Sequence, residues 1–419
     1  MKEEFLHYVW RYGLYNSGSL KTTGGKNLEV IFPGRYNPDA GPDFLEARLL
    51  IDKVMWIGHV EVHIRASDWK KHGHQDDPAY DPVVLHVVYD HNCEVKNSHG
   101  IAIPAVEIKF KSGYLEKYQA LMSEISPIPC GVRWQDHSPV KIENAIISMG
   151  IGRMQRRMEL FHNQLDENRG GMKQLFIQVI SRGFGFGKNQ YPMELVGKSI
   201  KPIWLEKHNS NLFQLESIFF GQAGFIPERS RDTYLSALRT EYSYLSGKYN
   251  MIMPIGLRWK YLRMRPGNFP AVRLAQLSSF FHEKDDVVQF IRDLASDGNP
   301  DGIETRTSSY WKTHYDAGKK SSAEIRDMGS NSKLLIMINV VLPLTAFFDK
   351  YTRTTDNFEP WLEKLENLPP ENNYVCRKWE DIGFMIPNAF YSQAFLHIYR
   401  DYCAERNCLN CKIGHILIS

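Results

Sequence analysis

The spacing of hydrophobic positions divides the chain into a β-rich beginning and a helical remainder. In residues 3–12 the apolar side chains recur at helical spacing, and Gly13 then provides a stop. Next come four segments rich in β-branched and aromatic residues, separated by glycine, proline and aspartate clusters: 28–32, 45–51, 54–65 and 83–90. Residues 101–110 look like one more strand, with a proline at an edge or bulge. The pattern predicts a helix, three strands, a polar connection over 68–82 and then a strand.

From about residue 114 the apolar positions recur with a period near 3.6 residues, which predicts helices joined by short loops. The predicted helices cover 142–165, 172–183, 191–206, 212–222, 230–248, 270–296, 333–349, 357–367 and 387–406. Residues 297–332 are polar and rich in turn formers, so we expect a mobile loop or a domain boundary there. The fold class predicted is therefore α+β, with strands first and a largely α-helical C-terminal region.

Length and composition indicate a globular protein of several domains. A chain of 419 residues exceeds what one hydrophobic core usually organises. Its 43% hydrophobic and 24% charged residues are typical of globular proteins. We predict an α/β core over 1–130, a helical domain over 131–300 and a helical segment with a cysteine cluster over 301–419. The net charge of +3 is too small to indicate a nucleic-acid partner, so that case must rest on local patches.

The sequence shows neither an export signal nor a membrane span. The N-terminus carries two acids before its amphipathic stretch and has no small-residue cleavage site. The longest apolar run, 334–348, is shorter than the ~18–20 residues that a span needs, and it contains Asn339 and Pro343. We therefore expect this run to be a buried helix, and the protein to be soluble and cytoplasmic, without a membrane partner.

The most informative residues lie on the second and third predicted strands. Asp43 follows Gly-Pro at the start of one strand, and Glu61 lies within the next. Residues of one parity share a strand face. In 54–65 one face is apolar, and the other carries a dense row of ionisable side chains: His59, Glu61, His63 and Arg65. We therefore predict that Asp43, Glu61 and His63 carry the chemistry.

These residues resemble the PD-(D/E)xK nuclease superfamily, in which an acid after proline opens a strand and the next strand bears Glu-x-Lys. The resemblance implies a restriction-endonuclease-like mixed sheet in the N-terminal part. It also implies that Asp43 and Glu61 bind Mg²⁺ or Mn²⁺, which would polarise a phosphate and activate water. His63 stands where the superfamily has lysine, and a neutral imidazole can act as a base near neutral pH. The resemblance implies an accessory acid on the opening helix, for which Glu4 is the candidate.

Further histidines follow the acidic pair. His72 and His74 lie in the polar connection, and His86 lies on the next strand. Together with Glu61 and His63 they make a set of the kind that zinc, manganese or iron sites use. Two interpretations stay open: a metal site, or exposed loop histidines with one histidine in the core.

Three of the six cysteines crowd near the C-terminus, at Cys403, Cys408 and Cys411. The Cys-x2-Cys spacing is typical of metal-binding turns. His415 or Cys376 could supply a fourth ligand, for either zinc or an iron–sulfur cluster. The alternative is a set of reduced thiols packed in a terminal helix and turn.

A basic stretch over 258–273 carries five cations and no acid, with aromatic residues interleaved. Phosphate contacts with stacking would use this composition. The candidate nucleic-acid-binding residues are Arg65, Arg258, Lys260, Arg263 and Arg265. The alternative is an arginine-rich segment that pairs with acids elsewhere, such as Glu216 or Glu241.

Over nearly its whole length the chain resembles a bacterial family catalogued only as a domain of unknown function. The resemblance rests on Gly-Pro-Asp-Phe, Gly-x-Val-Glu-x-His, Asp-Trp-x-x-His-x-His, Leu-His-Val-Val and Tyr-Cys-x4-Cys-Leu-x-Cys. It implies no activity. From the residues we predict a metal-dependent nuclease that acts on DNA or RNA. The alternatives are a non-catalytic nucleic-acid-binding or scaffold protein with a degenerate core, and a histidine-rich transition-metal hydrolase.

Overall fold

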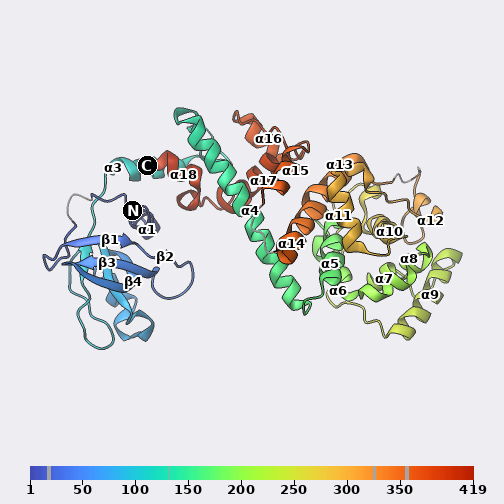
Figure 1. The fold of residues 1–419 in the computed structure, drawn as a ribbon, viewed down its shortest axis with the longest axis horizontal. Helices are drawn as coiled ribbons and strands as arrows, with labels where there is room; N and C mark the ends of the chain where they lie inside the picture. Colours follow the sequence, from blue (N-terminus) through green and yellow to red (C-terminus); the bar gives the residue numbers. More distant parts are fainter. Residues whose placement is uncertain (17–19, 132, 323, 325–326, 354–357) are drawn as a thin grey trace. The chain divides into compact units, whose positions relative to one another are not determined.

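The computed structural model describes residues 1–16, 20–131, 133–322, 324, 327–353 and 358–419. These residues group into two compact units (Figure 1). The first unit contains Met1–Met149, Lys378–Phe384 and Phe395–Ser419, and the second contains Gly150–Arg377 and Met385–Ala394. The predicted domain bounds at residues 130 and 300 stay a prediction. In the observed grouping, the C-terminal residues Phe395–Ser419 belong to the same unit as the N-terminal sheet.

A curled mixed sheet forms the N-terminal part of the first unit, in the order β1-β3-β4-β5-β6, with β2 paired to β3. Its strands are β1 (Leu28–Phe32), β2 (Arg35–Tyr36), β3 (Phe44–Ile51), β4 (Val54–Arg65), β5 (Val83–Asp90) and β6 (Ala105–Glu107). β1, β3 and β4 are antiparallel, whereas β5 and β6 continue parallel to β4. The strands predicted from the hydrophobic pattern are confirmed, but the last one, expected over 101–110, shortens to three residues.

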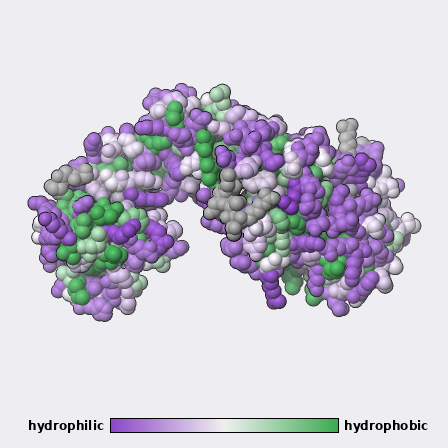
Figure 2. Space-filling view, viewed as in Figure 1, coloured by the Kyte–Doolittle hydropathy of each residue, from purple (hydrophilic) through white to green (hydrophobic). Residues whose placement is uncertain are grey.

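The β3–β4 hairpin follows from its sequence. Ile51 pairs with Val54, and the two residues between them, Asp52 and Lys53, both have positive φ, as a two-residue hairpin turn with the right twist requires. The predicted alternation of apolar and ionisable side chains holds along β4, but buried residues occur only in the second half of the strand. Near the turn, Val54 and Ile57 are 60% and 67% exposed, and Figure 2 shows hydrophobic residues gathered over the strands of this unit.

The second half of β4 is buried on both faces. Val60 and Val62 pack in the apolar core on one side, while Glu61 and His63 are buried on the other. Helix α1 (Glu3–Arg11) packs against β4 and buries Phe5, Leu6, Val9 and Trp10. The connection from β4 to β5 contains α2 (Asp68–Lys71), η1 (His74–Asp76) and η2 (Pro78–Tyr80). Trp69 of α2 is fully buried beside this connection, and its indole N–H donates to the Lys96 carbonyl at 3.0 Å.

The rest of the first unit is helical. It contains α3 (Ser112–Ser123), η3 (Trp134–Asp136) and the start of α4 (Pro139–Glu167). The returning C-terminal segment adds η7 (Tyr399–Cys403), η8 (Cys408–Asn410) and α18 (Lys412–Ile418). Both η8 and α18 pack against α3.

The second unit consists almost entirely of helices among its described residues, as the 3.6-residue periodicity predicts. Its first half contains α5 (Met172–Phe184), α6 (Gln190–Ser199), α7 (Pro202–His208), α8 (Leu212–Gln222), α9 (Thr233–Tyr249), η4 (Pro266–Asn268), α10 (Pro270–Phe281) and α11 (Val287–Asp297). The helices predicted over 191–206 and 270–296 are each two helices. Pro202 begins α7 and keeps Lys201 extended, which separates α7 from α6, and Glu283 has a φ of 57° in the break between α10 and α11.

The segment 297–332, expected to be a mobile loop or a boundary, lies inside the second unit and has regular structure in much of its described part, while residues 323, 325 and 326 lie outside the described residues. It contains η5 (Pro300–Gly302), α12 (Ser309–Thr313) and a short hairpin of β7 (His314–Asp316) and β8 (Lys319–Lys320). Trp311 is fully buried, and its ring stacks on Phe220 of α8 at 4.3 Å. The polar composition was misleading because one tryptophan anchors the segment to the helical core.

The remaining helices are α13 (Ser330–Ile336), η6 (Met337–Val341), α14 (Leu342–Arg353), α15 (Glu359–Glu366), α16 (Tyr374–Asp381) and α17 (Ala389–Ile398). Continuous helix over Ser330–Thr352 is the one described segment long and apolar enough for a membrane span. Because 67% of its apolar window is buried, it has the burial of a core helix, as the sequence predicted.

Candidate metal centre

Asp43 and Glu61 meet at the β3–β4 pair. Asp43 immediately precedes β3, and Phe44 lies opposite Val60 in the antiparallel register. The Asp43 N–H donates to Glu61 Oε2 at 3.1 Å, and the Val62 N–H donates to Asp43 Oδ2 at 3.0 Å. The two carboxylates therefore lie near each other, the Glu61 carboxylate held by the Asp43 N–H and the Asp43 carboxylate held by the Val62 N–H.

Two histidines approach the second oxygen of Glu61, and a third lies beside one of them. His74 Nε2 and His63 Nε2 lie 3.4 Å and 3.6 Å from Glu61 Oε1. His63 Nε2 also lies 3.1 Å from His72 Nδ1, and the three histidines have ligand atoms within 4.8 Å of one another. Gly73, with a φ of 79°, turns the chain between His72 and His74, which lets both rings approach the same point.

The spacing of these atoms fits a transition-metal ion. Bonds of 2.0–2.2 Å separate the ligands of a tetrahedral ion by about 3.3 Å. The measured separations of 3.1, 3.4 and 3.6 Å are close to that value. Three imidazoles and one carboxylate suit zinc, manganese or iron, whereas Mg²⁺ prefers oxygen ligands. His63, His72 and His74 could therefore hold one ion together, and Glu61 lies beside two of them.

His86 lies behind His63. Its Nε2 is 2.9 Å from His63 Nδ1, and both side chains are fully buried. Burial, followed by the neighbouring imidazoles, lowers the pKa of His63 to about 2 and that of His86 to about 3. Both rings are therefore neutral, which is the form that binds metals. His86 contacts the opposite nitrogen of His63 and so orients that ring, and its predicted role as a ligand stays a prediction.

Sequence reasoning missed two residues of helix α1, Glu3 and His7. His7 Nε2 lies 3.3 Å from Asp43 Oδ2 and 3.8 Å from a Glu3 oxygen, so these three residues form a second group of potential ligands. Burial raises the pKa of Glu3 to about 7. Their i, i+4 spacing was a signal, because it places an acid and a histidine on one helix face. Glu4, the expected accessory acid, lines a neighbouring cleft instead.

Burial also raises the pKa of Glu61, and the adjacent charge of Asp43 adds to that effect. For His7, burial lowers the pKa, but hydrogen bonding to Asp43 and its charge outweigh burial, so the net shift is upward. A cation at this place would relieve the cost of two neighbouring carboxylates in a buried site.

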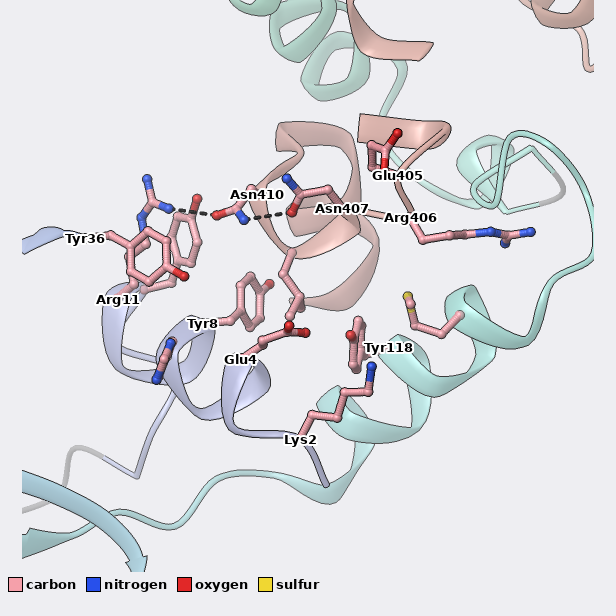
Figure 3. Close-up of a pocket in the computed structure, with 14 residues that line it drawn as sticks. Lys2, Glu4, Tyr8, Arg11, Tyr36, Tyr118, Glu405, Arg406, Asn407 and Asn410 are labelled. Carbon is pink, nitrogen blue, oxygen red and sulfur yellow. Dashed lines mark hydrogen bonds between the residues drawn. The ribbon is translucent and has the colours of Figure 1, made fainter. Parts of the chain in front are cut away.

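A cleft of about 360 Å³ adjoins this group within the first unit and shares His7 with it. Figure 3 shows Glu4 between the rings of Tyr8 and Tyr118. Arg11 donates to Asn410 at 3.0 Å at one end. The other charged lining residues include Lys2, Glu405 and Arg406. The cleft thus combines tyrosine rings with both cations and acids.

Four cysteines gather in the same unit, and one of them was not predicted. Cys130, which follows α3, joins the predicted thiols, and all four are 6–7% exposed: Cys130, Cys403, Cys408 and Cys411. Every pair among them is close enough to interact electrostatically, and burial first, then these neighbours, raises the pKa of Cys130 and Cys403. Cys403 lies 403 − 130 = 273 positions after Cys130, which explains why the local pattern of the sequence gave no sign of this partner.

The two predicted fourth ligands, His415 and Cys376, belong to different units. His415 Nδ1 is 2.9 Å from the Tyr8 hydroxyl, and its ring stacks on Tyr12 at 4.2 Å. Cys376 belongs to α16 within the second unit, and its role as a ligand stays a prediction. The N–H groups of Ile413 and Gly414 donate to the Cys411 sulfur, as amides often do to metal-bound thiolates.

The predicted nucleic-acid-binding cations divide between the units. Arg65 ends β4, is exposed and lies 3.8 Å from Asp90. The other four lie in the irregular segment between α9 and α10 of the second unit: Arg258, Lys260, Arg263 and Arg265. The acids suggested as their partners have other contacts, because Glu216 accepts a hydrogen bond from Tyr234 and Glu241 accepts one from Gln214.

A family model described as "Protein of unknown function (DUF2851)" matches residues 3–374. The chain belongs to this family. The match covers most of the chain, including α1 and both groups of potential metal ligands, and confirms the resemblance to a domain of unknown function. Comparison with curated proteins and with solved structures gives no match. The DUF2851 description states no activity, so the function must be argued from the site.

Proposed function

We propose that this DUF2851 protein is a metal-dependent nuclease that hydrolyses phosphodiester bonds of DNA or RNA. One observation carries the proposal: the ligand atoms of His63, His72 and His74 lie within 4.8 Å of one another, Glu61 Oε1 lies 3.4 and 3.6 Å from two of these histidines, and Asp43 lies beside Glu61. Paired carboxylates and imidazoles with raised or lowered pKa values, gathered beside a cleft, are typical of a catalytic site.

The arrangement of elements supports this choice of reaction. The order is a helix, three antiparallel strands (β1, β3 and β4), a short helix and parallel strands, with Asp43 immediately before β3 and Glu61 on β4. This is the order that the PD-(D/E)xK resemblance implies. The tyrosines of the cleft, with Lys2 and Arg11, offer stacking surfaces and cations for a nucleotide chain.

A divalent ion bound here would polarise a phosphate oxygen and lower the pKa of a bound water. Glu61, His63, His72 and His74 would hold that ion, and Asp43 would add an oxygen ligand between them and His7. We assign His63 to binding rather than to proton abstraction, because both of its nitrogens already face other imidazoles. His72 is exposed, so water and substrate can reach the site from its side.

A histidine-rich hydrolase with another substrate is the second candidate. It is favoured by the nitrogen-rich ligand set and by His63 in place of the nuclease lysine. A non-catalytic protein with a degenerate core is the third. The three differ in metal content and in cleavage of nucleic acids.

The experiment is a cleavage assay with the full chain. Single- and double-stranded DNA and RNA are incubated with Mn²⁺, Zn²⁺ or Mg²⁺, and the products are compared for wild type, Asp43→Asn and Asp39→Asn. Asp39 is a matched control because it also follows a proline but is exposed and belongs to neither group of potential ligands. We expect Asp43→Asn to lower activity by at least about tenfold and Asp39→Asn to leave it unchanged. Cleavage by neither wild type nor variants, with any of the metals, contradicts the proposal.

We also propose that Cys130, Cys403, Cys408 and Cys411 hold a structural zinc ion or an iron–sulfur cluster. The support is the gathering of four buried thiols in one region, with two amides that donate to Cys411. Among the described residues, the groups whose ligand atoms lie within 4.8 Å of one another do not include these four thiols, so the ion or cluster would draw them closer together. Metal and acid-labile sulfide are measured in anaerobically purified wild type, Cys130→Ser and Cys376→Ser. Iron with sulfide indicates a cluster, zinc alone indicates a single ion, and both should be lost only in Cys130→Ser. Equal metal content in all three proteins refutes the assignment.

A further inference from the structure

A second cavity, of about 400 Å³, lies within the helical unit. Its walls come from the end of α5 with the loop that follows, from the segment before η4, and from the start of α10. Asn189 holds two of these walls together. Its side chain donates to the Lys260 carbonyl at 2.9 Å and accepts from the Lys260 N–H at 2.8 Å, and Asn189 is only 2% exposed. The cavity is therefore a built feature of this unit.

Arg273 of α10 lines the cavity and is 7% exposed. Its guanidinium donates to Asn268, Gln276 and Ser332, which are all neutral, and it lies over the Phe186 ring at 4.1 Å. Its Nε is buried and has no hydrogen-bond partner among the described residues. Burial lowers the pKa of this group to about 10. A buried cation without an anionic partner is costly, so the fold retains a charge that an anion would compensate.

Three more cations line the same space: Lys188, Arg263 and Arg265. The Lys188 ammonium donates to the Leu262 and Arg263 carbonyls, at 2.5 Å and 3.4 Å. Arg263 has a φ of 59°, an uncommon conformation for a residue with a side chain, which these bonds help to hold. None of the described residues that line the cavity is an aspartate or a glutamate.

We propose that this cavity binds the phosphate group of a small phosphorylated molecule. Arg273 at its base and Arg263 and Arg265 at its exposed rim supply the forked donors that suit phosphate oxygens. The volume lies within the range of small-molecule sites, which is roughly 300–1,000 Å³. The proposal does not depend on the metal centre, which belongs to the other unit.

Isothermal titration calorimetry of the full chain tests the proposal with inorganic phosphate, a nucleoside monophosphate and a short single-stranded oligonucleotide. The variants are Arg265→Ala, Arg263→Ala and Arg258→Ala. Arg258 is the matched control, because it is exposed in the same segment but does not line the cavity. Arg273→Lys, checked by its melting temperature, tests the buried position while keeping the charge.

We expect phosphate and the monophosphate to bind wild type, and Arg263→Ala and Arg265→Ala each to weaken binding by about tenfold or more. Arg258→Ala should bind as wild type does, and a folded Arg273→Lys should bind more weakly. No binding of either small ligand to wild type overturns the proposal, as does equal weakening by Arg258→Ala. Much tighter binding of the oligonucleotide, with the same dependence on Arg263 and Arg265, overturns the small-molecule assignment in favour of a nucleic-acid backbone.

Discussion

Replacing Glu61 by glutamine should have opposite effects on the metal-free and metal-bound protein. Glu61 Oε2 accepts the Asp43 N–H, and the carbonyl oxygen of glutamine can accept the same bond. The change therefore removes a charge and hardly alters packing. Burial, followed by the charge of Asp43, raises the pKa of Glu61, so the ionised carboxylate destabilises the metal-free fold at neutral pH. Without metal, Glu61→Gln should be as stable as wild type or more stable.

With metal the order should reverse. An ion at a hundredfold excess over its Kd stabilises the native state by about 2.7 kcal/mol. For a unit of this size, 1 kcal/mol shifts Tm by roughly 2–4 °C, so wild type should gain about 5–11 °C. Even changes outside the ligand shell weaken metal binding by about 10–100-fold. If Glu61→Gln weakens metal binding by that factor, the Tm of the variant should rise by only about 1–6 °C at the same metal concentration.

Differential scanning calorimetry of the full chain, with chelator and then with Mn²⁺ or Zn²⁺, measures both effects. Glu29→Gln is the matched control, since Glu29 is an exposed strand glutamate on β1. Any metal at the four cysteines is common to all these proteins and cancels in the comparison. An identical metal-induced rise in Tm for wild type and Glu61→Gln, or no rise in wild type, would refute the assignment of Glu61 as a ligand.

Two further predictions concern the helical unit. Glu216 is fully buried and burial raises its pKa from 4.5 to about 7, so the native state holds a proton that the unfolded state loses. The free energy of unfolding should therefore fall by about 3 kcal/mol as pH rises from 4.5 to above 7, and Glu216→Gln should remove that slope in urea titrations at several pH values. An unchanged slope would contradict this. Two helical glycines should respond oppositely to alanine in the same assay. Gly221→Ala should cost about 1–3 kcal/mol because its methyl group would overlap the Tyr242 ring, whereas Gly247→Ala, which meets open space, should gain about 0.5–1 kcal/mol. Equal effects of the two substitutions would show that the packing around Gly221 yields.

The local pattern of the sequence was sufficient for the elements and for part of the site. Periodicity placed the strands β1, β3, β4 and β5 and most helices, because side-chain spacing along a strand or helix depends only on nearby residues. The pair Asp43 and Glu61 could be predicted because a hairpin brings residues of adjacent strands together in a register that its short turn fixes.

Only the tertiary structure decided which distant segments come together and which strand residues are buried on both faces of the sheet. Cys130 joins Cys403, and His7 reaches Asp43, through the packing of helices, which no local period encodes. Strand parity could not tell that Glu61 and His63 are buried, because the covering loop with His72 and His74 approaches from outside the sheet. The burial of Trp311 against Phe220 also depends on tertiary packing, and it explains why the polar segment around Trp311 is structured. A single large apolar side chain offsets much polar composition once a core is there to receive it.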